Sequence, residues 1–244
     1  MNTLRNELGN ELGNELGNKY ILMILNCKKY YYKRYKQINN FLNNKILCGI
    51  KYFHVIGDKS KCNNKEYFID RNANIIYTNT EDDYLSLPHK TICCMKALLE
   101  NFDFDYILKT DDDQRLVVNN FFILLDQQIE KKRREKQNID YFGMLSVVKP
   151  HISHNYKIHK EDNFPDNYIV GDHNVFSNGR FYGLSRRNAK DLVENKFDLI
   201  KKELCEDWAI AKYQNKDWRN NYFNISTNKI FKDRPESSLI VKYK

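Results

Sequence analysis

The sequence predicts an α/β fold in which helices flank a mainly parallel central sheet. Short apolar segments alternate along the chain with longer segments whose apolar residues recur at helical spacing. Most intervals between the apolar segments are long enough to hold a helix, as connections between parallel strands require. With 244 residues and 14% aromatic residues, the chain can bury one sizeable core without disulfides or a structural metal.

The first 18 residues differ in composition from the rest. The tetrapeptide Asn-Glu-Leu-Gly occurs in succession from residue 6 to residue 17. A glycine at every fourth position disfavours a helix by about 1 kcal/mol each relative to alanine, and one leucine per repeat gives no adequate buried face. We expect residues 1–18 to form a disordered, low-complexity tail and residues 19–244 to form a single domain.

Six apolar segments are expected to form strands. Each is short and bounded by polar or turn-forming residues, which is typical of strands in an α/β sheet. The expected strands are 19–26, 51–57, 74–79, 105–109, 140–148 and 181–185. Ligands of such sheets bind at the carboxyl ends of the strands, so the residues that follow a strand are candidates for the site.

The helices are expected between these strands. Pro88 lies near the start of one of them, where proline is tolerated, and another begins after an asparagine and ends in basic residues. The expected helices are roughly 29–44, 87–102, 119–136, 186–194 and 203–216. Residues 149–178 are rich in His, Asn and Asp, and we expect them to form a loop.

The chain is basic, with a formal charge of +8 and a pI of about 9.0, which favours an anionic partner. Much of this charge lies in residues 28–36, where tyrosines are interleaved, and in residues 131–136. One hypothesis is therefore a nucleic-acid-binding protein or a metal-dependent nuclease. A protein that only binds nucleic acid leaves the chain's acidic motif unexplained, because carboxylates without a metal repel phosphate.

That motif is the run Asp111, Asp112 and Asp113, which directly follows an apolar strand. Adjacent carboxylates repel one another unless a cation holds them together. Mg²⁺ and Mn²⁺ prefer oxygen ligands and often take only one or two protein carboxylates, completing their shell with water and phosphate oxygens. A divalent metal site is one interpretation of the run, and a solvated acidic turn is the other.

Four motifs in the same order resemble the family 31 glycosyltransferases, which include β-1,3-galactosyltransferases, β-1,3-N-acetylglucosaminyltransferases and fringe-type enzymes. They are DDYLSLPHKT (82–91), YILKTDDD (106–113), NGRFYGLSRRNA (178–189) and CEDWAIAK (205–212). Asp82, Tyr84, Leu87, Lys90 and Thr91 match the first motif of the family, whereas Ser86 and Pro88 replace its usual Asn and Thr. The family's Arg-rich segment is similar to residues 28–42, which places Arg34 among the donor-binding residues.

The resemblance implies a GT-A type nucleotide-sugar-binding fold and a Mn²⁺- or Mg²⁺-dependent, inverting hexosyltransferase. The implied donor is a UDP-sugar and the implied acceptor is a glycan or another hydroxyl compound, with no nucleic acid and no membrane span. By resemblance, Asp113 and Asp111 bind the metal, and Asp111, Asp112 and Lys90 bind the donor. Charge that builds on the diphosphate as the glycosidic bond breaks would be neutralised there.

The catalytic base implied by the resemblance is Asp207, with Glu206 as second choice. Inversion requires a base on the face of the sugar opposite to the leaving group, where it takes the proton of the acceptor hydroxyl. The alternative is that the two residues only form the acidic first turn of a helix, which the helix dipole favours.

One departure from the family concerns the metal. Many members complete the metal shell with a histidine beyond the Glu-Asp helix, but no histidine follows Asp207 in this sequence. His173 is a candidate replacement, and a catalytically inactive relative that serves as a binding module is an alternative.

The location expected for the chain is cytoplasmic. The cysteines are scattered without a CxxC pattern, which favours reduced thiols, and the longest apolar run is too short to cross a bilayer. Family members in animals are usually Golgi-anchored through an N-terminal membrane helix, which we do not find in this sequence. The Asn-, Lys-, Ile- and Tyr-rich composition suggests an AT-rich genome, such as that of a large DNA virus acting in the host cytoplasm or of a microbe.

Overall fold

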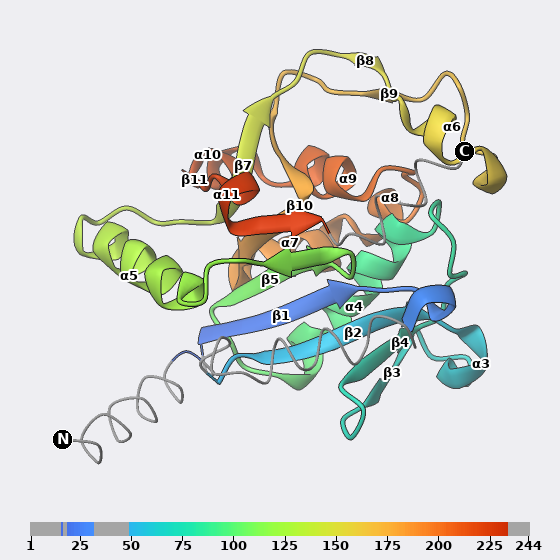
Figure 1. The fold of residues 1–244 in the computed structure, drawn as a ribbon, viewed down its shortest axis with the longest axis horizontal. Coiled ribbons are helices and arrows are strands. Elements are labelled where there is room, and N and C mark those ends of the chain that lie inside the picture. Colours follow the sequence, from blue (N-terminus) through green and yellow to red (C-terminus); the bar gives the residue numbers. More distant parts are fainter. Residues whose placement is uncertain (1–15, 17–18, 32–48, 234–244) are drawn as a thin grey trace.

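The computed structural model describes residues 16, 19–31 and 49–233, and its centre is an eight-stranded sheet (Figure 1). The order of the strands is β11-β7-β10-β5-β1-β2-β4-β3. In chain order they are β1 (Tyr20–Leu25), β2 (Lys51–Gly57), β3 (Tyr67–Asp70), β4 (Ile75–Thr78), β5 (Tyr106–Asp111), β7 (Tyr141–Val147), β10 (Val175–Ser185) and β11 (Tyr222–Asn224). Strands β4, β2, β1 and β5 are parallel in succession, as are β7 and β11, whereas β3 and β10 pair antiparallel. The expected α/β class with a mostly parallel sheet is confirmed.

Helices cover both faces of this sheet. Those in the described part of the chain are α3 (Lys59–Cys62), α4 (Leu87–Asn101), α5 (Phe121–Arg134), α6 (Asn155–Ile158), α7 (Arg186–Asn195), α8 (Phe197–Ile200), α9 (Glu206–Tyr213), α10 (Lys216–Asn220) and α11 (Thr227–Ile230). Helices α4, α7, α8 and α9 pack on one face, and α5 packs on the other.

The alternation of side chains along β1 explains why the strand is apolar throughout. Ile21 and Met23 face the core shared with α4, while Tyr20 and Leu22 face the core shared with α5. All four are buried, because a central strand in a three-layer fold has no face toward water. Each such side chain contributes about 1.5–3 kcal/mol by its removal from water.

The segment expected to be a loop, residues 149–178, contains more regular structure than its sequence indicated. It holds a ribbon of β8 (His151–Ile152) and β9 (Ile169–Val170), then α6, the 3₁₀ turn Lys160–Asp162 and the first residues of β10. Figure 1 shows the ribbon and α6 projecting beyond the sheet. The loop prediction was wrong for these residues, because β10 pairs with β7 from Val175 onward and continues past a register shift between Ser177 and Tyr182.

A second small ribbon lies beside the end of β5. It pairs β6 (Gln114–Leu116) with β12 (Phe231–Asp233), and its apolar residues join the core around α5. Apart from Leu16, the expected tail 1–18 lies outside the described residues, as do Arg34 and most of the expected helix 29–44. No helix in the described part of the chain has the length and apolar character needed to cross a membrane.

Candidate active site

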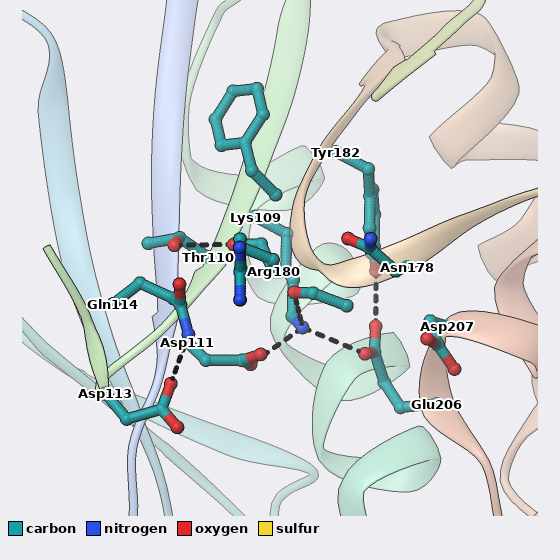
Figure 2. Close-up of polar contacts among 12 residues, drawn as sticks. Lys109, Thr110, Asp111, Asp113, Gln114, Asn178, Arg180, Tyr182, Glu206 and Asp207 are labelled. Carbon is teal, nitrogen blue, oxygen red and sulfur yellow. Dashed lines mark hydrogen bonds and ion pairs between the residues drawn. The ribbon is translucent and has the colours of Figure 1, made fainter. Parts of the chain in front are cut away.

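An acidic cluster lies where the carboxyl end of β5 meets β10 and the first turn of α9. Asp111 is the last residue of β5, and Asp113 lies two residues further along the chain. Glu206 and Asp207 are the first two residues of α9. Figure 2 shows these carboxylates on two sides of one buried side chain, that of Lys109. The two acidic motifs, which are far apart in sequence, therefore lie close together.

Lys109 joins the two halves of this cluster. Its ammonium nitrogen lies 2.7 Å from Asp111 Oδ1 and 3.1 Å from Glu206 Oε2, and it donates a hydrogen bond of 2.5 Å to the carbonyl oxygen of Gly179. The side chain is 1% exposed. Burial alone lowers the pKa of Lys109, but the charges of Asp111, Glu206 and Asp207 outweigh it, so the pKa lies above the ordinary value and the group stays charged.

Sequence reasoning did not assign a role to Lys109. The available signal was strand alternation: Ile107, Lys109 and Asp111 share one face of a strand that is otherwise apolar. A lysine on the buried face of a central strand requires partners, because an unpaired buried charge is strongly unfavourable. Those partners were not apparent from local sequence, since Glu206 and Gly179 arrive from α9 and β10.

The environment of Asp111 opposes its ionisation in the absence of a bound cation. The pKa of Asp111 is raised to about 7, chiefly by removal from bulk water, although 35% of its side chain remains exposed. Lys109 lowers this pKa, while the charges of Asp113 and Glu206 raise it. A cation bound at this point would reverse the balance, because it stabilises the ionised carboxylates.

Glu206 and Asp207 have different environments. Glu206 is 6% exposed, its Oε2 contacts Lys109, and its Oε1 accepts a hydrogen bond from the Tyr182 hydroxyl. Asp207 is partly exposed, and its carboxylate accepts hydrogen bonds from the backbone N–H groups of Trp208, at 2.8 Å, and Gly179. Both oxygens of Glu206 are thus held by the buried side chains of Lys109 and Tyr182, whereas Asp207 is held by backbone N–H groups and is partly exposed. This difference favours Asp207 over Glu206 as a proton acceptor.

The pKa of Asp207 suits a general base at neutral pH. Its pKa is raised to about 6, chiefly by burial and then by the neighbouring charge of Glu206, while Lys109 and the two backbone N–H groups act in the opposite direction. A base with a pKa just below the working pH is ionised and still accepts a proton readily.

Gly179 marks the gap between the two carboxylates. A methyl group added at its Cα would lie 3.1 Å from Lys109 Nζ and 3.6 Å from both Asp111 Oδ2 and Asp207 Oδ2. The two carboxylate oxygens therefore lie within roughly twice the latter distance of each other. The two carboxylates therefore face one narrow gap beside Gly179.

The other two aspartates of the triplet, Asp112 and Asp113, have different contacts. Asp112 is buried, its backbone N–H donates to the carbonyl of Leu25 at 3.0 Å, and its charge contributes to the raised pKa of Cys27 after the effect of burial. Asp113 accepts a hydrogen bond of 2.9 Å from the Gln114 side chain. Asp112 thus continues toward the end of β1, while Asp113 stays beside Asp111.

Lys90 is a second buried lysine, and it is paired within the protein. Its ammonium lies 2.5 Å from Asp82 Oδ1 and donates to the carbonyl of Asn26 at 3.1 Å. The Asp82 carboxylate also accepts the backbone N–H groups of Gly57 and Lys28. This arrangement ties the start of α4 to the carboxyl ends of β1 and β2. The matching residues of the first motif therefore build the wall of the site, and direct donor binding by Lys90 stays a prediction.

His173 lies on an exposed turn with a φ of 64°, and its backbone N–H donates to the carbonyl of Val148. No contact with Asp111 or Asp113 is found for it, so its assignment as a metal ligand stays a prediction. Among the described residues, no group of three or more His, Cys, Asp and Glu side chains is arranged to hold a metal ion.

The residues present still fit a hard divalent cation that binds together with a diphosphate. Asp111 and Asp113 offer two carboxylates two residues apart at the end of β5, and because burial raises the pKa of Asp111, an added positive charge would favour its ionised form. Mg²⁺ and Mn²⁺ can accept such a partial set when water and phosphate oxygens supply the other ligands. The donor set therefore suits a cation that arrives with a diphosphate better than a permanently caged one.

If this gap receives the donor sugar that the sequence resemblance implies, replacing Gly179 by alanine should impair its transfer while leaving the fold intact. The backbone at Gly179 has no positive φ, and the added methyl would lie 3.1 Å from Lys109 Nζ, which would have to shift by only a few tenths of an ångström. The methyl group would occupy the gap between Asp111 and Asp207, so we expect kcat/KM to fall roughly 100-fold by misplacement of the donor sugar. The midpoint of thermal unfolding should stay close to that of the wild type, and UDP binding should be retained. Unchanged kcat/KM would show that the sugar lies elsewhere.

A family model described as galactosyltransferase matches residues 33–221. A probable β-1,3-galactosyltransferase 12 of Arabidopsis thaliana is 35% identical over 67 residues, which cover 26% of this chain and 18% of that protein.

Solved structures with a similar outline are more distant. HddC from Yersinia pseudotuberculosis is 14% identical with a TM-score of 0.38, covering 99% of this chain and 85% of HddC. HddC complexed with GMP-PN is 13% identical with a TM-score of 0.39, covering 93% of this chain and 100% of that chain. A197 from STIV is 11% identical with a TM-score of 0.35, covering 77% of this chain and 80% of A197.

Proposed function

Since the chain belongs to the galactosyltransferase family, we propose that it moves a sugar from a UDP-sugar to a hydroxyl group of a glycan or other acceptor, with inversion at the anomeric carbon. The observation that supports this proposal most strongly is the placement of Asp207 across a narrow gap from Asp111, at the carboxyl end of β5. One side chain belongs to the proposed donor half and the other is the proposed base.

In the donor half, Asp113 and Asp111 are the residues that would hold Mn²⁺ or Mg²⁺, which supplies positive charge to the diphosphate leaving group when bound. Asp112 lies beside them near the end of β1 and is proposed to bind donor hydroxyl groups. Asp82 and Lys90 hold the ends of β1 and β2 in place behind this half. The carboxyl ends of parallel strands are where α/β sheets bind nucleotides.

In the base half, Asp207 removes the proton of the acceptor hydroxyl. The acceptor oxygen then forms a bond to the anomeric carbon while the bond from that carbon to the diphosphate oxygen breaks. The proton ends on Asp207, and the electron pair of the broken bond leaves with UDP. The transition state has oxocarbenium character, as in glycoside hydrolysis.

The acceptor is proposed to bind between this half and the projecting segment that carries β8, β9 and α6. A small aromatic cluster links that segment to the site: Phe164 and Trp208 are buried, and Tyr84 and Phe176 pack against them. The centre of the Tyr84 ring lies 6.1 Å from that of Phe164, and Phe176 lies 6.2 Å from Trp208. Aromatic walls with a few polar groups are typical of sites for small organic ligands.

The pH dependence of transfer should report Asp207. Its pKa is raised to about 6, and only the ionised form accepts a proton, so activity should rise with pH through about 6 and level off above it. At pH 5 the rate should be roughly tenfold below the plateau, as expected for one group with that pKa. The profile is measured at saturating Mn²⁺, so that ionisation of Asp111 is complete. A rate independent of pH between 5 and 8 would contradict the assignment.

The direct test of the donor class is a screen of UDP- and GDP-sugars for hydrolysis and transfer by the purified protein, with Mn²⁺ and with EDTA. We expect turnover of at least one UDP-sugar that requires the metal. Turnover of none, together with no stabilisation by UDP and Mn²⁺, would support the inactive relative instead.

A further inference from the structure

We propose that Lys109 is a positioning residue that couples the donor half of the site to the base half; this inference rests on the proposed function above. All three N–H donors of its ammonium group are taken by protein groups, so Lys109 acts through these partners and not on the donor or the acceptor itself. Lys109 acts through Asp111 on one side and through Glu206 on the other.

Three contacts from three different elements converge on the Lys109 ammonium. Asp111 of β5 lies at 2.7 Å, Glu206 of α9 at 3.1 Å, and the carbonyl of Gly179 in β10 at 2.5 Å. An ammonium group has three N–H donors, so these contacts use its full donor capacity. The Tyr182 ring lies 5.6 Å from the same nitrogen and completes the enclosure.

The contacts fix the two carboxylates relative to each other. Glu206 is held between Lys109 and the Tyr182 hydroxyl, and this fixes the first turn of α9 that carries Asp207. Asp111 is held through Oδ1, which leaves Oδ2 directed toward the gap beside Gly179. A single buried cation thus sets the distance between the proposed metal ligand and the proposed base. Such preorganisation matters because a displacement of about 1 Å can lower a rate roughly 100-fold.

Lys109 also sets the charge around Asp207. The charged and titratable groups that face Asp207 come from five parts of the chain and are Lys109 and Asp111 of β5, Glu206 and Cys205 at the start of α9, Tyr182 of β10, Tyr141 of β7 and Tyr84 before α4. Of these, Lys109 is the cation. Its removal would leave Asp207 next to the uncompensated charge of Glu206, so proton loss from Asp207 would become less favourable.

The experiment compares Lys109→Met, which keeps length and loses charge, with the wild type. The first readout is a carboxyl ¹³C NMR titration of the metal-free protein, in which the signal absent from Asp207→Asn identifies Asp207. We expect the measured pKa of Asp207 to rise by about one unit or more in Lys109→Met. The second readout is sugar transfer at pH 8, which should fall roughly 100-fold.

A second variant separates charge from position and protects the test against misfolding. Lys109→Met leaves two carboxylates in a buried setting, whereas the double variant Lys109→Met/Glu206→Gln removes one charge of each sign. We expect the double variant to fold, to return the pKa of Asp207 toward the wild-type value, and still to transfer sugar at least tenfold more slowly, because Asp111 has lost its anchor. Arg187→Met is the matched control. It breaks an ion pair with buried Asp140, which directly precedes β7 at the end of the sheet opposite to Asp111, and should change neither readout.

If the double variant transferred sugar at the wild-type rate, the proposal would be overturned, since Lys109 would then only neutralise the charge of Glu206. An unchanged pKa of Asp207 together with near-wild-type transfer in Lys109→Met would overturn it as well. Absence of transfer by the wild type would refute the proposed function, and the titration would then decide separately whether Lys109 controls the charge state of Asp207.

Discussion

Replacement of Asp207 by asparagine is expected to lower kcat for sugar transfer by about 1,000-fold, within the range that general-base catalysis contributes. The amide cannot accept the proton of the acceptor hydroxyl, but it has nearly the same shape. Asp207 is partly exposed and its protein contacts are backbone N–H groups, so the fold should tolerate the change. The increase in melting temperature caused by UDP and Mn²⁺ should persist, because the donor half is untouched. Steady-state kinetics and a thermal shift assay with UDP and Mn²⁺ measure the two effects.

Glu206→Gln is the comparison that makes this prediction specific. Glu206 is buried and paired with Lys109, so its replacement should destabilise the protein by about 3–5 kcal/mol, as breaking a buried ion pair commonly does. Asp207→Asn should leave stability nearly unchanged. If Asp207→Asn transferred sugar at the wild-type rate while a folded Glu206→Gln did not, the roles of the two residues would have to be exchanged.

Asp113→Asn is expected to remove binding of the metal–nucleotide pair. For the wild type, UDP with Mn²⁺ at about 100 times its dissociation constant should add about 2.7 kcal/mol of stability, which corresponds to roughly 5–10 °C in a chain of this size. Loss of a charged metal ligand should weaken binding at least about 100-fold, so the shift should fall to about 1 °C.

Asp103→Asn provides the control for a change in net charge. Asp103 is fully exposed. It lies just before the start of β5, whereas Asp111 is the last residue of that strand. The thermal shift of this variant should equal that of the wild type. A full shift in Asp113→Asn would show that the cation binds without Asp113.

The main elements could be predicted because their sequences satisfy local and tertiary preferences together. Residues 87–102 were expected to form a helix, and α4 occupies Leu87–Asn101. The expected strand 105–109 is extended to Asp111, because the pairing with β1 continues as far as Leu25. The position of Asp111–Asp113 at the carboxyl end of a strand was likewise predictable. It follows from the apolar segment directly before them and does not depend on the order of the strands in the sheet.

Features that depend on distant pairing could not be predicted. The start of β10 at Val175 depends on its pairing with β7, which a run rich in polar residues does not indicate. The role of Lys109 depends on Glu206 and Gly179, which reach it only in the folded chain. The family motifs identified both halves of the site, whereas the side chain that joins them was found only in the structure.

The basic segments have a simpler explanation where the structure describes them. At the end of α5, Arg133 pairs with Glu130 and Asp105, and Lys132 lies 3.9 Å from Glu135. This is a solvated helix end with its own counter-charges. Family membership accounts for the aspartate triplet without a nucleic acid, so the sugar-transfer hypothesis explains more of the chain.

The central claim is metal-dependent transfer from a UDP-sugar with inversion, and the stereochemistry of the product tests it most directly. The wild-type protein is incubated with Mn²⁺, the UDP-sugar that the donor screen selects and a hydroxyl acceptor, and the anomeric configuration of the product is read from the H1–H2 coupling by ¹H NMR. From an α-linked donor we predict a β-linked product whose formation stops when EDTA is added. An α-linked product, or transfer that persists in EDTA, would contradict the mechanism.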